Sequence, residues 1–173
     1  YVGNLTAQTE YASQVKGLYW RIDQQEAYYS TWYYFPNDFR GTIGGWCNIM
    51  QWKDDSPPYD PIGIVLAKEY SDGTWLTVQE WKGAWGARIM KLPEGRWFHL
   101  QIYYKLGYTD GVVKVWVDGQ LVKEWSGIKT RGLGLNVMWG IGNFPDATHP
   151  SNQSIYTDDT YVTSEYIDPA IWG

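Results

Sequence analysis

The sequence is 173 residues long, carries a formal net charge of −5 at pH 7, and contains 12 Trp and 15 Tyr but only 4 Phe. This length fits one domain with a full hydrophobic core, so we expect a single domain over residues 1–173. The negative charge argues against nucleic acid as a partner, and no apolar run approaches the roughly 18 residues of a membrane span. The single cysteine, Cys47, excludes an internal disulfide and is expected to be a small buried side chain.

Strand signals extend through almost the whole sequence, whereas helix signals are confined to residues 6–15. The expected strands are rich in β-branched and aromatic residues and are separated by turn-forming residues. In chain order they span residues 26–35, 45–53, 61–68, 74–80, 96–105, 112–117, 120–125, 133–143 and 154–164. Asp118-Gly119 favours a type I′ hairpin, because both central residues of that turn take positive φ. Strands this regular predict an all-β fold, a two-sheet antiparallel β-sandwich or jelly roll.

Alternation along the strands assigns one face of each strand to the core. For three of them the expected core residues are Phe98, Leu100, Ile102, Tyr104, Val113, Val115, Val117, Leu135, Val137, Trp139 and Ile141. The opposite face then carries Tyr103, Lys105 and Trp116, while Trp52 and Trp97 are expected in the core.

The high content of Trp and Tyr indicates a surface for flat ligands. Both side chains combine an apolar face with a polar edge, which suits a pyranose with its apolar C–H face and its rim of hydroxyls. Trp81 and Trp85 lie in a Gly-rich stretch and are predicted to be exposed binding residues on a loop. Trp116 either stacks on a sugar or packs under a loop, and Trp32 and Tyr34 share one side of a strand with aromatic residues on both faces.

Three runs of sequence resemble a known family. They are GRWFHLQIYYK (95–105), VVKVWVDGQLV (112–122) and SIYTDDTYVTSEYI (154–167). They are similar to concanavalin-like jelly-roll domains, and within these to the heparinase-like and alginate-lyase-like polysaccharide lyases and the carbohydrate-binding modules that share their fold. The resemblance runs from about residue 26 to residue 167 and implies the same concanavalin-like jelly roll.

Departures from the family's motifs bear on activity. Lyases of this type remove the proton α to a uronate carboxyl group, which needs a base, usually Tyr or His, and groups that stabilise the carboxylate. The resemblance aligns residues 51–53 (Gln-Trp-Lys) with a Gln-x-His motif, so Lys53 stands where the family has His. In the second motif Met138 replaces Lys, Gly142 replaces the catalytic Tyr, and Asn143 matches. The resemblance therefore implies a sugar cleft that has lost the lyase chemistry.

Polar residues complete the expected carbohydrate site. Gln51 and Lys53 share one face of a strand and, with Asn143, are expected to orient sugar hydroxyls. If Lys53, Lys105 and Lys114 shared a face, they would instead attract an anionic glycan.

We expect no required cofactor, and the one candidate metal is a structural Ca²⁺ at Asp158 and Asp159. Calcium needs six to eight oxygen ligands, so other segments would have to supply the rest. A glycoside hydrolase needs two carboxyl groups across a cleft, and Glu69 with Glu80 is the only plausible strand pair.

The sequence is thus interpreted as a non-catalytic carbohydrate-binding module for a polysaccharide. The net charge favours a neutral β-glycan such as β-glucan, cellulose or xylan. Because the chain starts at Tyr1 without Met or a signal peptide, we expect a piece of a larger, secreted carbohydrate-active enzyme. One alternative is a polysaccharide lyase that cleaves a polyuronide by β-elimination with a displaced base, for example Tyr103 beside Lys105. The other is a structural jelly roll without a glycan site.

Overall fold

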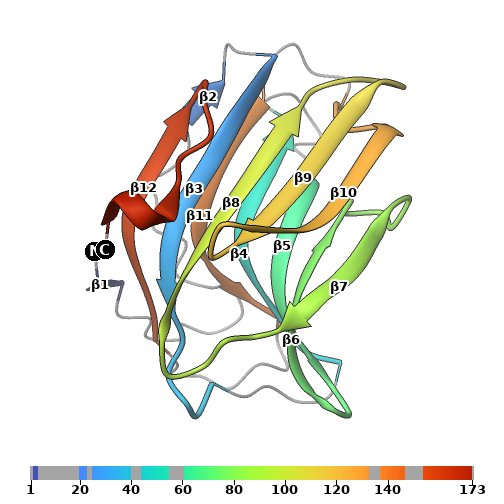
Figure 1. The fold of residues 1–173 in the computed structure, drawn as a ribbon. Helices are drawn as coiled ribbons and strands as arrows, with labels where there is room; N and C mark the ends of the chain where they lie inside the picture. Colours follow the sequence, from blue (N-terminus) through green and yellow to red (C-terminus); the bar gives the residue numbers. More distant parts are fainter. Residues whose placement is uncertain are drawn as a thin grey trace.

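The structure is a computed structural model that describes residues 2–3, 20–22, 25–39, 44–54, 61–132, 137–146 and 154–172. Two six-stranded sheets account for nearly all of it (Figure 1). Sheet A has the order β1 (Val2–Gly3), β12 (Ile155–Thr163), β3 (Glu26–Tyr34), β8 (Trp97–Lys105), β9 (Gly111–Val117) and β10 (Gln120–Ile128). Sheet B has the order β2 (Trp20–Ile22), β11 (Val137–Pro145), β4 (Trp46–Asp54), β5 (Pro61–Tyr70), β6 (Gly73–Gln79) and β7 (Gly86–Lys91). A 3₁₀ turn at Pro169–Trp172 follows.

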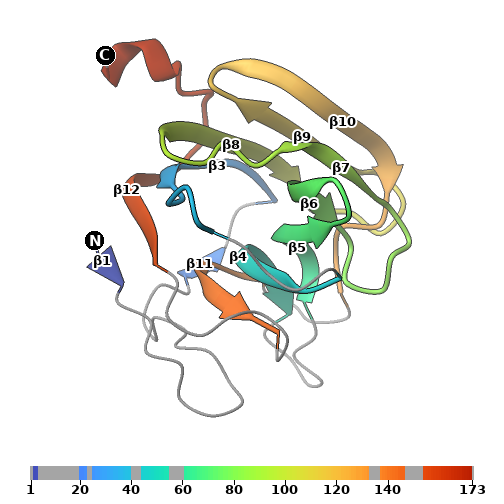
Figure 2. The same cartoon turned by 90° about the horizontal axis from the view of Figure 1, so that it is seen from below.

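The two sheets stack face to face, as Figure 2 shows from below, and every pair of neighbouring strands is antiparallel. The predicted all-β jelly-roll sandwich is therefore confirmed. All nine expected strands are present, with ends shifted by up to four residues. Strand β7 was missed because its residues are half-exposed and lack a clear alternation. The segments 6–15 and 133–136 lie outside the described residues, and no helix among the described residues is long and apolar enough to cross a membrane.

The core lies between the sheets and follows the predicted alternation. The expected core residues of β8, β9 and β11 are buried, apart from Leu135, which lies outside the described residues. Cys47 is also buried, and burial raises the pKa of its thiol, which suits a small apolar role and not a nucleophile. Trp97 was expected in the core, but it begins β8 on the outer side of sheet A with 44% of its surface exposed, against Tyr34.

A stacked pair of rings joins the centre of one sheet to the other. Trp52 on β4 lies parallel to Tyr104 on β8, with ring centroids 4.3 Å apart and planes 8° from parallel. The Trp52 ring is edge-on to Tyr29 as well, at 5.2 Å. Gly63, the partner of Trp52 on β5, leaves room for this stack, since a Cβ there would lie 2.8 Å from the Tyr104 hydroxyl oxygen.

We therefore expect Gly63→Ala to lower the free energy of unfolding by about 1–3 kcal/mol, because the added methyl group overpacks a core that cannot expand locally. The measurement is chemical denaturation followed by Trp fluorescence. Gly142→Ala is the matched control, because a Cβ there meets nothing within 4 Å, and its effect should stay within about 0.5 kcal/mol. Equal effects of the two changes would contradict this account of Gly63.

Candidate functional site

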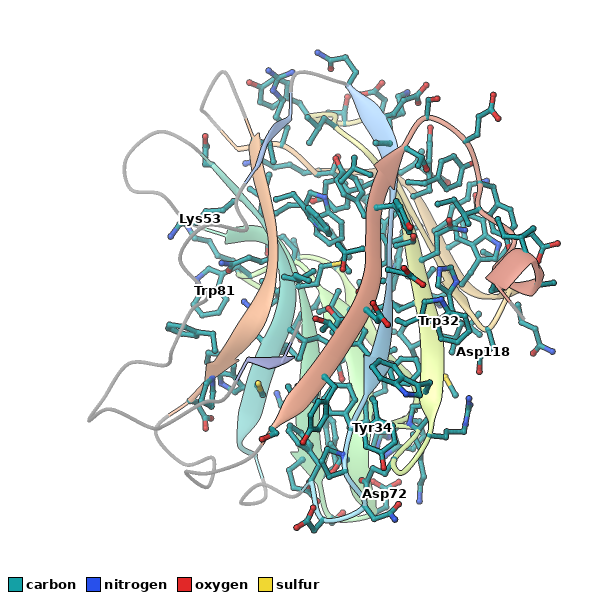
Figure 3. All side chains as sticks on the ribbon, turned by 90° about the vertical axis from the view of Figure 1, so that its left-hand side faces the viewer. Trp32, Tyr34, Lys53, Asp72, Trp81 and Asp118 are labelled. Carbon is teal, nitrogen blue, oxygen red and sulfur yellow. The ribbon has the colours of Figure 1, made fainter. Side chains whose placement is uncertain are left out.

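The structure divides the predicted binding residues between two opposite outer faces of the sandwich. Figure 3 shows Lys53 and Trp81 on the side of sheet B that faces away from sheet A, and Trp32 on the corresponding side of sheet A. The alternation correctly separates inward from outward residues along β8, β9 and the described part of β11, but it does not tell which sheet carries each strand. The predicted binding residues therefore do not form one site.

Strand β4 turns two of the predicted polar residues to the outer face of sheet B. Because Trp52 points into the core, its neighbours Gln51 and Lys53 point outward. The Gln51 amide is buried and accepts a hydrogen bond from Asn48 Nδ2 at 3.0 Å, which fixes its orientation. The other amide atom of Asn48, Oδ1, is buried and has no hydrogen-bond partner in the described part of the chain. Amides fixed in this way can bind sugar hydroxyls or a carboxylate.

Aromatic rings lie beside these amides. Trp81, on the loop between β6 and β7, is 40% exposed and packs edge-on against Trp46 of β4 with centroids 6.1 Å apart. Trp46 in turn stacks on Phe144 of β11 at 6.2 Å. The loop is held by Glu80, whose carboxylate accepts from the amide of Ala84 at 3.1 Å. The sequence analysis identified Trp81 but missed Trp46 and Phe144, because their side-by-side positions depend on the pairing of β4 with β11.

The outer face of sheet B carries cations that the net charge conceals. Lys53 and Lys68 are half-buried there, and neither forms an ion pair with another described residue. In contrast, Lys105 and Lys114 lie on sheet A and pair with Asp110 and Glu124, each at 3.1 Å. The idea that Lys53, Lys105 and Lys114 share a face is therefore wrong.

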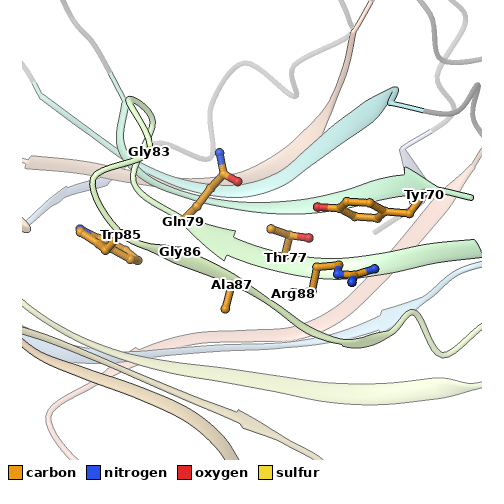
Figure 4. A pocket seen from close by; sticks show the side chains of 8 residues that line it. All are labelled: Tyr70, Thr77, Gln79, Gly83, Trp85, Gly86, Ala87 and Arg88. Atoms are coloured by element: carbon orange, nitrogen blue, oxygen red, sulfur yellow. The ribbon is translucent and has the colours of Figure 1, made fainter. Parts of the chain in front are cut away.

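A depression of about 270 Å³ lies on the same outer face, at strands β5 to β7 (Figure 4). Its polar lining residues are Tyr70, Thr77, Gln79 and Arg88. Trp85 also borders it, but the prediction that Trp85 is an exposed loop residue is wrong. Only 8% of Trp85 is exposed, because its ring packs on Trp125 and its indole N–H donates to the Lys129 carbonyl at 3.0 Å.

The outer face of sheet A is largely occupied by the chain itself. Trp116 contacts Tyr28 and Tyr166, with centroids 5.9 and 5.5 Å away, so it packs under the C-terminal segment. Gln101 exchanges two hydrogen bonds with the backbone of Ile167 at 3.3 and 3.0 Å. The C-terminal turn accordingly lies on the outer side of this sheet (Figure 2).

Tyr103 cannot serve as the displaced base of a lyase. Its hydroxyl donates a short hydrogen bond to Glu26. Desolvation and the bond to the Glu26 carboxylate raise the pKa of Tyr103 to about 12, which opposes proton abstraction near neutral pH. Tyr103 and Lys105 also lie on the opposite side of the sandwich from Gln51 and Lys53.

Trp32 and Tyr34 form a separate half-buried aromatic strip on sheet A. Trp32 packs on His99 at 5.2 Å, and Tyr34 lies between Trp97 at 5.6 Å and Tyr156 at 5.9 Å. These rings pack against one another. They are far from Asn48, Gln51 and Lys53 of β4, because the core separates the two sheets.

The metal and hydrolase hypotheses gain no support from the described residues. Asp158 and Asp159 are exposed on β12, and no group of three or more His, Cys, Asp or Glu side chains able to hold a metal is found in the part of the chain described. Glu69 is buried and accepts from the Thr74 hydroxyl at 2.6 Å, whereas Glu80 caps its own loop, so the two do not face each other across a cleft. Asn143 lies within β11, but its side chain is outside the described set.

Comparison with known proteins identifies the family. A sequence profile of the polysaccharide lyase family matches residues 5–161. The chain belongs to this family. No curated protein matches it in a sequence search.

Solved structures of lyases share the fold of this polysaccharide lyase family member. An endo-β-1,4-glucuronan lyase from the fungus Trichoderma reesei superposes with a TM-score of 0.67 at 14% identity, covering 97% of this chain and 78% of that one. An alginate lyase from Pseudomonas aeruginosa superposes with a TM-score of 0.61 at 13% identity, covering 86% of this chain and 68% of that one. An alginate lyase from Chlorella virus gives 0.59 at 12% identity, covering 95% and 85%. At such identities the likeness establishes the fold alone.

The positions that the resemblance aligns with the family's motifs lie side by side on β4 and β11. Strand β11 pairs with β4 so that Gly140 lies opposite Gln51 and Met138 opposite Lys53. Arg21 of β2, which the sequence analysis did not consider, pairs with Met138 from the other side. A Cβ at Gly142 would meet nothing within 4 Å, so there is open space at the position where the resemblance expects the family's Tyr.

Trp81→Ala and Trp116→Ala distinguish the two faces. Trp81→Ala should weaken polysaccharide binding about tenfold, since it removes one exposed ring, and leave stability nearly unchanged. Trp116→Ala should lower the free energy of unfolding by about 1–3 kcal/mol and leave binding unchanged, since its ring supports the C-terminal segment. Affinity electrophoresis measures binding, and chemical denaturation measures the free energy of unfolding. Loss of binding in Trp116→Ala with unchanged binding in Trp81→Ala would place the site on sheet A instead.

Proposed function

We propose that this chain is a polysaccharide lyase that binds a uronate-containing polysaccharide across the outer face of sheet B and cleaves it by β-elimination. One observation carries the proposal. Lys53 and Lys68 lie without carboxylate partners among the described residues, next to the fixed amides of Asn48 and Gln51. A neutral glycan would leave these half-buried cations uncompensated, whereas the carboxylates of a polyuronide would pair with them.

The reaction makes particular demands on such a face. A base takes the proton from C5 of the uronate, the C4–O bond breaks, and its electron pair leaves with the glycosidic oxygen, which gains a proton. The products are one fragment with a new reducing end and one fragment that ends in a C4–C5 unsaturated uronate. Negative charge builds on the carboxylate as the C5 proton leaves, so a cation and amide donors beside it lower the barrier. Lys68, on β5 near Tyr70, is suited to this role, while Lys53 and Gln51 on the outer side of β4 can hold the carboxylate of another uronate of the same chain.

One described side chain on this face can accept the proton, since Lys53, which the resemblance aligns with the family's His, acts here as a cation. It is Tyr70, in the depression at β5 to β7, the one phenol on this face among the described residues. Tyr70 lies nine residues along β5 from Pro61, the partner of Lys53, so it would act on a uronate bound at its own end of the face. Tyr70 has cations nearby, with Lys68 Nζ 5.7 Å and Arg88 Cζ 4.8 Å from its ring centroid.

A non-catalytic polysaccharide-binding module is the second candidate. The resemblance aligns Gly142 and Lys53 with the family's Tyr and His, and this supports binding without cleavage. The two functions differ in their product, since only a lyase generates an unsaturated uronate.

Incubation with glucuronan, alginate and polygalacturonate, followed by the ultraviolet absorbance of unsaturated uronate, tests the proposal. We expect absorbance to rise with at least one polyuronide and with no neutral glucan or xylan. Lys53→Ala should reduce the rate at low substrate concentration on the order of tenfold, because it removes a charge-assisted contact to a carboxylate of the bound polyuronide.

Lys114→Ala is the control, because this lysine also lies on the outer side of its sheet and is paired with Glu124 on the opposite face of the sandwich. Its rate should match that of the unchanged chain. Retention of polyuronides in affinity gels without any unsaturated product would reject the lyase and support the binding module.

A further inference from the structure

The depression at β5 to β7 gathers four polar side chains from three adjacent strands. Tyr70 comes from β5, Thr77 and Gln79 from β6, and Arg88 from β7. The register brings them together, because Thr77 pairs directly with Arg88 across β6 and β7. Figure 4 shows the Tyr70 hydroxyl directed toward Thr77 and Gln79.

The hydrogen-bonding capacity of this lining is largely unused. The Thr77 hydroxyl is buried, with 4% of the residue exposed, and has no hydrogen-bond partner among the residues that the structure describes. Neither the Gln79 amide nor the Tyr70 hydroxyl bonds to another described residue. Buried polar groups are nearly always satisfied in folded proteins, so an unsatisfied hydroxyl in a depression indicates a missing partner.

Arg88 is held in place while most of its donors stay available. Its guanidinium carbon lies 4.8 Å from the centroid of the Tyr70 ring and 4.7 Å from that of Trp75. Among the carboxylates of the described residues, the guanidinium reaches that of Asp72, through Nη1 at 3.5 Å. Asp72 also accepts from the Trp75 indole N–H at 3.1 Å, which fixes this cluster. A planar guanidinium fixed by flanking rings is suited to two-pronged binding of a carboxylate.

The end of the depression is rigid as well. Glu80 N–H donates to the Trp85 carbonyl at 2.9 Å, which closes the β6–β7 loop, and Trp85 is anchored to the Lys129 carbonyl. Gly86 lies against Gln79, and a Cβ there would be 2.5 Å from Gln79 Cβ. The position of the Gln79 amide therefore depends on the glycine opposite it.

We infer that this depression is a uronate subsite, in which Arg88 binds the carboxylate of one sugar residue while Thr77, Gln79 and Tyr70 bind its ring hydroxyls. The inference rests on the proposed function in that the glycan crosses sheet B. It adds that recognition of the acidic group at this subsite belongs to Arg88 and not to the lysines. Strand spacing of about 4.8 Å lets a glycan running from β4 to β7 place successive residues over successive strands.

Isothermal titration of oligoglucuronates, oligomannuronates and oligogalacturonates, each beside its carboxyl-reduced neutral counterpart, tests the subsite. The unchanged chain should bind at least one acidic oligosaccharide more tightly than its reduced form. Arg88→Gln should lower the affinity for the acidic ligand about 10- to 100-fold and leave the affinity for the reduced ligand unchanged. Thr77→Val should weaken both forms by a similar factor, because it removes a hydroxyl contact.

Arg96→Gln is the matched control, because Arg96 also pairs with an exposed aspartate, Asp118 at 2.9 Å, and Figure 3 shows Asp118 on the side of sheet A. It should alter neither affinity. Arg88→Lys retains the charge without the two-pronged geometry. Its affinity for the acidic oligosaccharide should lie between that of Arg88→Gln and that of the unchanged chain. This variant also decides the question if Arg88→Gln fails to fold.

Equal effects of Arg88→Gln on acidic and reduced ligands, or no binding of any acidic oligosaccharide by the unchanged chain, would overturn the subsite. The experiments distinguish a failure of the proposed subsite from a failure of the proposed lyase activity. Binding through Arg88 without unsaturated product would reject catalysis and keep the subsite. Cleavage with unchanged discrimination in Arg88→Gln would keep catalysis and reject the subsite.

Discussion

The stack of Trp52 on Tyr104 is the contact on which the arrangement of this molecule depends. It joins the middle of sheet B to the middle of sheet A and fixes the direction of β4 side chains. Because side chains alternate along a strand, one indole pointing inward obliges Gln51 and Lys53 to point outward. A slip of one residue would bury a lysine and expose a tryptophan, so the core also enforces the polar face. The core and the site are set by the same register.

Net charge conceals which cations of this protein have carboxylate partners. The chain is acidic as a whole, with a net charge of −5, yet among the described residues Lys105 and Lys114 of sheet A are paired with carboxylates while Lys53 and Lys68 of sheet B are not. Net charge thus describes the average field and misses the local one. This is why composition alone favours a neutral glycan, whereas the geometry of one face favours an acidic glycan.

The fold could be predicted from sequence because alternation and turn residues are local signals. The core faces of β8, β9 and β11 and the outward position of Trp116 follow from a period of two. The site could not be assembled in the same way, since which strand lies beside which depends on long-range pairing. Trp85 and Trp97 illustrate the limit: one is buried by Trp125 from a distant strand, and the other is exposed because it stands at a strand end.

The contact between Gln101 and Ile167 has a consequence for how the chain is made. The two partners are 66 residues apart, and the side-chain amide of Gln101 finds both of its hydrogen bonds on the backbone of residue 167. During synthesis, β8 emerges from the ribosome long before that segment does. The outer side of sheet A therefore stays open beside Gln101, with Trp116 and Tyr28 uncovered by Tyr166, until residues 166–167 have been made. This covering contact thus forms after β8 and β9, and the aromatic face is open to association in the interval.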